Sequence, residues 1–128
     1  MFKIQLSDFK GECVVNAIFT GEFDRALVIK FIDKMAEYEV RCPGNKLLVD
    51  CAGVSKVSID FEDLKSIVKF VRENDKRQGK TAFVVGADVS RVLMAKLFVD
   101  LVGVFRPNQE KTFRRLDHAI GWLCPNDC

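Results

Sequence analysis

The stretch GNKLLVDCAGVSKVSIDFEDL, residues 44–64, decides the fold of this 128-residue chain. A short, continuously apolar run, Leu47-Leu48-Val49, ends at Asp50; small residues and an acidic segment that begins a helix come next. A run of this kind is typical of a buried strand in the parallel sheet of an α/β protein. In such folds ligands bind at the carboxyl edge of the sheet. The sequence therefore predicts a strand over Lys46–Cys51, with a candidate functional edge just beyond it.

The composition is that of one globular domain. Apolar residues make up 48% of the chain and charged residues 30%, and the net charge is +2. A nucleic-acid-binding protein would show a clearer basic excess, so we expect no nucleic acid among the partners. No apolar run approaches the ~20 residues of a membrane span, and the N-terminal segment lacks an apolar signal core. We expect a cytoplasmic, single-domain protein over residues 1–128, with an ordered core of about residues 2–123.

The cysteine pattern argues against a metal site. The chain has one His and five cysteines, at positions Cys13, Cys42, Cys51, Cys124 and Cys128. No two of them are spaced as CxxC, which a zinc site usually requires. We expect buried thiols that pack as small apolar side chains, and no metal or cofactor.

Periodicity predicts the elements before the third strand. Phe2–Leu6 alternates apolar and polar residues, as a half-buried strand does, and Cys13–Phe23 predicts a second strand that breaks at Gly21. The polar SDFKGE segment between them suits the turn of an antiparallel hairpin. Asp24–Val40 changes to a helical period with one broad apolar stripe.

Helices and strands alternate after the third strand. The predicted elements are a helix over Phe61–Gln78, a strand over Lys80–Gly86, a helix over Val89–Val102, a short strand over Lys111–Arg115 and a final helix over Asp117–Leu123. Asp60 is the expected N-cap of the first of these helices, and Asp88 or Ser90 that of the second. This order predicts an α/β fold with a mixed, largely parallel sheet of four to five strands, covered by about four helices.

The ordered set of motifs resembles the STAS domain superfamily, in particular its SpoIIAA-like branch of small bacterial proteins. The resemblance covers about residues 2–123 and is carried by four segments: TGEFDRALVIKFIDKM (20–35), KLLVDCAGV (46–54), GKTAFVVG (79–86) and TFRRLDHAIGWL (112–123). It implies the sheet and helices described above. It also implies a regulatory domain that works by binding another protein, as the anti-sigma-factor antagonists of this family do.

The resemblance also bears on phosphorylation. The family's antagonists carry a phosphorylatable serine in an Asp-Ser-Ser-Gly-like turn after the third strand. Here the region reads VSKVSIDFEDL, residues 54–64, without Ser-Ser-Gly. Ser58 is the nearest candidate, and Ser55 is another. Asp60, Glu62 and Asp63 would repel a phosphate at that helix start, so the sequence favours a surface without a phosphorylation switch, with phosphorylation of Ser58 as the alternative.

The helix predicted over Val89–Val102 has two apolar rows. We expect one of them to face the sheet, formed by Val92, Leu93, Leu97 and Leu101. The other contains Met94, Phe98, Val102 and Phe105. Two rows are more than one packing face needs, so Met94, Phe98 and Phe105 predict an apolar pocket or a homodimer face. Lipid-binding Sec14-type domains resemble the family in topology, which makes a lipid or small apolar molecule a candidate ligand.

We interpret the chain as a non-catalytic STAS-like regulatory or protein-interaction domain of unknown partner. Its partner surface is expected to include Asp50, Ser55, Ser58 and Asp60. The alternative is a carrier of a lipid or a small apolar ligand. An enzyme is the least favoured interpretation, because His118 is the sole histidine and no catalytic set can be named around it.

Overall fold

The computed structural model describes residues 1–39, 41–42, 46–74 and 79–125. Within these ranges it contains five strands and four helices. In chain order they are β1 (Phe2–Phe9), β2 (Glu12–Asp24), α1 (Arg25–Glu39), β3 (Lys46–Ser58), α2 (Phe61–Asn74), β4 (Thr81–Val84), α3 (Val89–Val102), β5 (Glu110–Phe113) and α4 (Leu116–Leu123). The predicted order of elements is confirmed.

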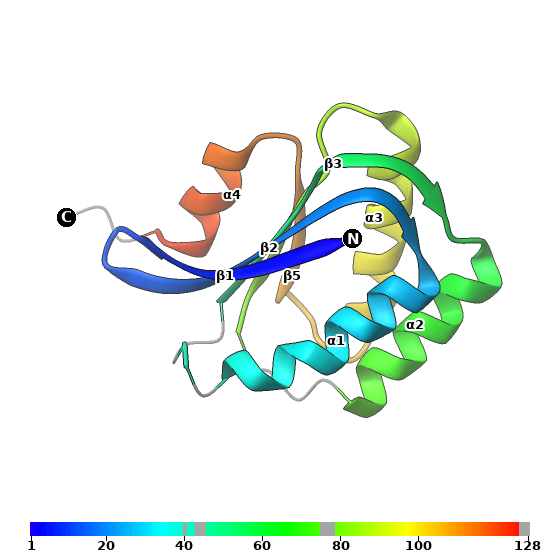
Figure 1. Cartoon of the computed structure of the whole chain (residues 1–128), viewed down its shortest axis with the longest axis horizontal. Coiled ribbons are helices and arrows are strands. Elements are labelled where there is room, and N and C mark those ends of the chain that lie inside the picture. The colour runs from blue at the N-terminus through cyan, green and yellow to red at the C-terminus, as the bar shows by residue number, and fades with distance from the viewer. Residues whose placement is uncertain (40, 43–45, 75–78, 126–128) are drawn as a thin grey trace.

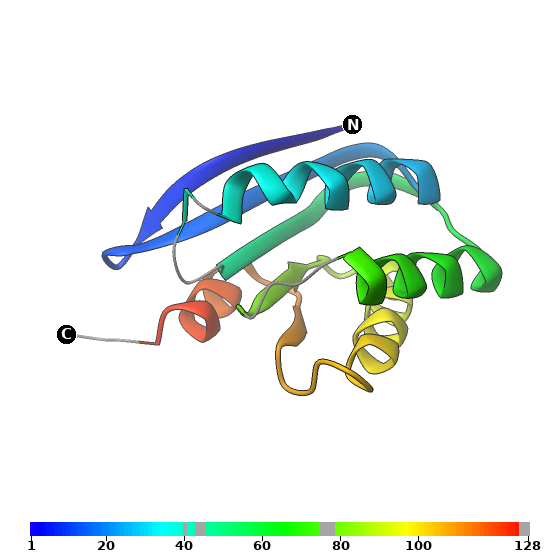
Figure 2. The ribbon, with the colours of Figure 1, turned by 90° about the horizontal axis from the view of Figure 1, so that it is seen from below.

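The strands form one sheet in the order β1-β2-β3-β4-β5. Figure 1 shows this sheet together with its helices. β1 is antiparallel to β2, and the other neighbouring pairs are parallel. The predicted mixed, largely parallel sheet is therefore confirmed. Figure 2 shows α1 and α2 side by side, and these two helices contact each other.

The two faces of the sheet are covered by different helices. Alternate side chains of β4 contact α3 on one face and α4 on the other. The ring of Phe83 meets the ring of Phe98 on α3, with centroids 5.6 Å apart. The neighbouring residues Ala82 and Val84 pack instead with Leu123 of α4. Because successive side chains in a strand point to opposite faces, α3 and α4 lie on opposite sides of β4. α1 and α2 share the side of α3 through a common apolar cluster.

The hairpin at the start of the chain is antiparallel, as predicted, but its turn is tighter. β1 continues to Phe9, which pairs with Glu12. Lys10 and Gly11 form the two-residue turn, with φ of 56° and 81°. Positive φ at both positions is the signature of a type I′ turn, whose twist matches that of the strands. Gly11 N–H also donates to Asp8 Oδ1 at 2.9 Å.

The third strand is longer than the predicted Lys46–Cys51, because β3 continues to Ser58. The small residues after Asp50 were expected to form a loop. They instead pair with the second half of β2, from Thr20 with Gly53 to Asp24 with Ser58. A Cβ on Gly53 would lie 3.2 Å from Thr20 Cγ2, so the small residue permits the close approach of the strands.

The expectation that every cysteine is a free thiol is wrong for two of them. Cys13 and Cys42 form a disulfide across 29 residues of sequence. Cys51 and Cys124 are buried free thiols, as predicted. Cys128 lies outside the described residues. The disulfide was not predictable from spacing alone, because its two cysteines meet only when α1 returns the chain towards the start of β2.

Candidate functional site

The second half of β3, Cys51–Ser58, extends beyond the point where β4 ends. Asp50, opposite Val84, is the last β3 residue that pairs with β4. From there the strand pairs with β2 alone, and we call Cys51–Ser58 the protruding half of β3. Its register against β2 shifts twice, between Ile18 and Thr20 and between Gly21 and Glu22. Such bulges redirect side chains and are common next to functional sites.

The Asp50 side chain bonds to the backbone two residues further along the chain, as an aspartate in a turn does. Its Oδ1 accepts a hydrogen bond from Ala52 N–H at 3.0 Å, across the first register shift. Asp50 follows Leu48 by two residues and pairs with Val84, and both of those side chains pack with α4. The Asp50 carboxylate therefore belongs to the face of the sheet that α4 covers in part, and not to the start of α2.

The chain turns away after β4 at Gly86, which has a φ of 70° that favours glycine. Asp88 then caps α3 by accepting from Arg91 N–H, which confirms one of the two predicted caps. The start of α3 thereby occupies the place beside the protruding half where β4 would have continued.

Arg91 takes over part of the pairing that β4 would have supplied. Its Nη1 donates to three carbonyl oxygens of the protruding half, those of Cys51, Ala52 and Val54, at 3.0, 3.2 and 2.9 Å. Carbonyls beside a strand that ends need such donors. Sequence reasoning missed this role. The only signal is a single arginine in the first turn of a largely apolar helix.

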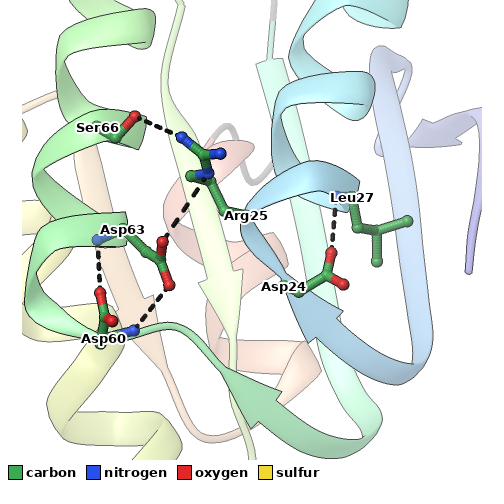
Figure 3. Close-up of polar contacts among 6 residues, drawn as sticks. All are labelled: Asp24, Arg25, Leu27, Asp60, Asp63 and Ser66. Carbon is green, nitrogen blue, oxygen red and sulfur yellow. Dashed lines mark hydrogen bonds and ion pairs between the residues drawn. The ribbon is translucent and has the colours of Figure 1, made fainter.

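The start of α2 is held by a reciprocal pair of aspartates, shown in Figure 3. Asp63 N–H donates to Asp60 Oδ1 at 2.7 Å, and Asp60 N–H donates to Asp63 Oδ2 at 3.2 Å. Asp60 is thus the N-cap, as predicted, in an arrangement equivalent to a capping box. Arg25 Nε of α1 lies 3.9 Å from Asp63 Oδ1, and Arg25 Nη1 donates a hydrogen bond to Ser66 Oγ at 3.3 Å. These contacts join the first turns of α1 and α2.

The two candidate serines differ in exposure. Ser55 is exposed and lies at the second register shift, where it has no partner residue in β2. Ser58 is half-buried and pairs with Asp24, whose Oδ1 accepts from Leu27 N–H at 2.8 Å. A phosphate on Ser58 would therefore face one carboxylate across the strands and lie close to Asp60 in sequence. Phosphorylation of Ser58 stays a prediction, in acidic surroundings that oppose it.

A cavity of about 100 Å³ lies beneath the protruding half of β3. Residues from β2, α1, β3, α2, β4 and α3 line it, and nearly all of the exposed lining is apolar. Val54 and Val57 contribute the wall on the β3 side, and Met94 and Phe98 the wall on α3. Native interiors contain few voids larger than a water molecule. This cavity is partly open to solvent.

Two residues with polar side-chain groups, Cys51 and Arg91, line the cavity. Burial, followed by the nearby Asp50 charge, raises the pKa of the Cys51 thiol to about 12. Cys51 therefore stays protonated and unreactive at neutral pH. Arg91 also lines the cavity, but its Nη1 is occupied by the three carbonyls of β3.

The row of α3 that was expected to face the sheet is divided: Val92 is buried and Leu101 packs against the cluster beneath α2, as predicted, but Leu93 and Leu97 are not buried. These two leucines are 63% and 38% exposed. Met94 and Phe98 instead face the cavity and the cluster beneath α2. Phe105 packs against the same cluster but does not line the cavity. Both rows are apolar, so hydrophobicity alone could not assign the inner one.

The described residues contain no group of three or more His, Cys, Asp or Glu side chains that could hold a metal ion. None of the described helices has the length and apolar character needed to cross a bilayer. His118 is exposed on α4, and Ser58 lies at the end of β3 next to the start of α2.

The order of strands and the helices that cover the sheet are those of a SpoIIAA-like fold. No protein-family model matches the sequence, and no curated protein sequence matches it. The evidence for the fold is therefore structural, and it confirms the resemblance that the sequence motifs predicted.

Two solved structures are similar to this chain over nearly its whole length. One is an uncharacterized protein with a SpoIIAA-like fold from Shewanella loihica PV-4, with a TM-score of 0.62 and 15% identity, over 96% of this chain and 93% of that chain. The other is an anti-sigma factor antagonist from Mycobacterium paratuberculosis, with a TM-score of 0.55 and 18% identity, over 96% and 94%. At these identities the likeness establishes the fold alone.

Proposed function

We propose that this protein is a non-catalytic regulatory domain whose protein partner docks on the protruding half of β3 and the first turn of α2. The observation that carries the proposal is the extension of β3 beyond the last residue that pairs with β4. It presents Ser55 and Lys56 as exposed side chains on a strand that the sheet supports from one side only. Asp60 adds a carboxylate beside them. Exposed polar residues on a rigid support are typical of recognition surfaces.

The fold supports a protein partner of a particular class. One structural neighbour is an anti-sigma factor antagonist, which acts on an anti-sigma factor. By this analogy the partner of the present chain is an anti-sigma factor or a protein of similar role, and the chain acts in the cytoplasm. If a modification controls docking, Ser58 and the more accessible Ser55 are the residues that would carry it.

Site-specific photo-crosslinking tests the docking surface. A photoreactive amino acid replaces Ser55 in cells of the source organism, and a matched control replaces Gln5, which is exposed on β1 at the far edge of the sheet. We expect one discrete protein adduct from position 55 and none from position 5. The adduct should disappear when Lys56 is also changed to Glu. Equal adducts from both positions, or none from position 55, would refute the docking surface.

A homodimer is the finer part of this proposal. The outer row of α3 exposes Val89, Leu93 and Leu97, three apolar residues four positions apart. Such a row can be buried against a second copy of itself. Sedimentation equilibrium should then show a dimer that Leu93→Glu converts to a monomer. A wild-type protein that is already monomeric at high concentration would exclude this face as a self-association site.

A second candidate function is the transport or sensing of a lipid or small apolar molecule, supported by the cavity beneath β3. Native mass spectrometry after gentle purification separates it from a purely protein-binding role. A co-purifying apolar molecule supports the carrier, and protein free of any ligand favours the interaction domain.

A further inference from the structure

We propose that the cavity beneath the protruding half of β3 is a binding site for a small, uncharged apolar molecule about the size of one aromatic ring. The proposal deepens the second candidate function by naming the ligand class, and it rests on that candidate. It does not depend on protein docking at Ser55. Three properties of the cavity carry it: its volume, its lining and the state of its polar groups.

The volume sets the size of the ligand. The cavity measures about 100 Å³. Apolar cavities of roughly 150 Å³ remain dry and accept benzene or xenon. This cavity is smaller but partly open, so it takes about one aromatic ring, and a methyl substituent can extend towards the open side. A long acyl chain exceeds that volume. This size distinguishes the proposed ligand from the lipid that the Sec14-like topology suggested.

The lining sets the shape and polarity of the ligand. Phe83 and Phe98 contact each other edge to face at 5.6 Å, and both line the cavity. Aromatic rings favour such packing geometry with a further ring. Met94 adds a flexible thioether, which adapts to the shape of an apolar ligand and favours contact with aromatic groups.

The polar groups exclude a charged ligand. Among the described lining residues Arg91 alone carries a charge, and its Nη1 already serves three carbonyl oxygens of β3. Asp88 Oδ1 lies 4.0 Å from Arg91 Nε and offsets the positive charge. A carboxylate ligand would be repelled by Asp88 and would have to lose its hydration in an apolar space. The Cys51 thiol is neutral as well. An uncharged molecule meets neither cost.

The three methionines of the chain make the test specific. In protein labelled with ¹³C at the methionine methyl groups, Met94 reports on the cavity. Met35 is the internal control. It lies on α1, is buried in an apolar cluster with residues of β2 and β3, and does not line the cavity. Titration with toluene should shift the Met94 signal saturably and leave the Met35 signal in place. Benzoate, of similar shape but charged, should bind at least about tenfold more weakly.

Filling the cavity provides the matched variant. Ala95→Leu places extra carbons in the cavity from α3, and Ala26→Leu makes the same change at an exposed position of α1. The toluene shift should be lost in the first variant and retained in the second. If Ala95→Leu does not fold, Val57→Leu fills the cavity from the β3 side.

Four outcomes would overturn the inference. They are the absence of a saturable Met94 shift, a shift unchanged in the filled variants, benzoate binding as strong as toluene binding, and binding of palmitate without binding of toluene. The last outcome would keep the carrier function and reject only the ligand class. Absence of any binding would reject both, whereas crosslinking at Ser55 would be unaffected.

Discussion

The two halves of β3 belong to one strand but lie in different surroundings. The first half, Lys46–Asp50, pairs with β2 and β4, and Leu48 in it is fully buried. The protruding half pairs with β2 alone. Arg91 donates hydrogen bonds to its carbonyl oxygens, and a cavity lies beneath it. The first half is therefore held by strand pairing on both sides, and the second by pairing with β2, by the buried side chain of Val54 and by the hydrogen bonds from Arg91. The comparison teaches that one strand can have both a segment buried in the core and a segment with exposed polar side chains.

The largest expected effect is in the first half. Leu48→Ala should lower the free energy of unfolding by about 3 kcal/mol, because the lost side chain leaves a cavity between the sheet and α4. Urea unfolding followed by circular dichroism measures it. Val57→Ala in the protruding half should cost about 1 kcal/mol, since Val57 already borders an empty space. An equal or larger loss for Val57 would remove the distinction between the halves.

Arg91→Met should act on the protruding half alone. The variant keeps an apolar stem but leaves three carbonyls without their donor, and it should cost about 2 kcal/mol. Hydrogen exchange should become faster at Gly53–Ser58 and stay unchanged at Leu47–Asp50. Lys96→Met, an exposed change on the same helix, is the control. Faster exchange across the whole of β3 would show that its halves are one cooperative unit.

The cap of α2 should have a smaller effect. Asp60→Ala removes the acceptor for Asp63 N–H and should cost about 1 kcal/mol, whereas Asp60→Ser should retain most of the stability. Glu62→Ala, exposed in the same first turn, should change stability by less than about 0.5 kcal/mol. Thermal unfolding of the three variants distinguishes them. A loss from Glu62→Ala as large as that from Asp60→Ala would mean that general charge, and not the cap, stabilises the helix start.

The smallest effect concerns pH at the base of the first half. Lys46, at the start of β3, donates a hydrogen bond to Glu12 and thereby lowers the pKa of that carboxyl below its ordinary value of 4.5. A lowered folded-state pKa gives stability that is present above pH 4.5 and is lost as the pH falls through the lowered pKa. Glu12→Gln should therefore be less stable than wild type at neutral pH, with the difference vanishing in acid. Urea midpoints from pH 2 to 7 measure this, with Glu22→Gln as the exposed control.

The sequence predicted the order of elements because their apolar periods are strong. Val89–Val102 was predicted with the bounds that the structure shows, and Asp60 was correctly assigned as a cap. The length of β3 was missed, since Ala52, Gly53 and Ser55 are residues of low strand propensity. Their strand conformation comes from pairing with β2, which no local pattern encodes.

The candidate site was predicted only in part. Its place after the third strand followed from the abrupt end of an apolar run, and Asp60 and Ser55 do lie on the exposed side of the protruding half and α2. Asp50 was grouped with them although its side chain belongs to the face of α4. The bulges after Asp50 change which face each residue occupies, and a bulge has no sequence signal here. Arg91 was missed for the same reason, because its partners are backbone carbonyls.

The disulfide between Cys13 and Cys42 has a mechanical consequence. Its two cysteines are 29 positions apart in the sequence, and the covalent loop that they close contains α1 and most of β2. If a single molecule is stretched from its two ends, this loop cannot extend while the bond is intact. The fully extended oxidised chain should therefore be roughly 90 Å shorter than the reduced chain. Optical-tweezer pulling with and without a reductant would reveal that hidden length directly.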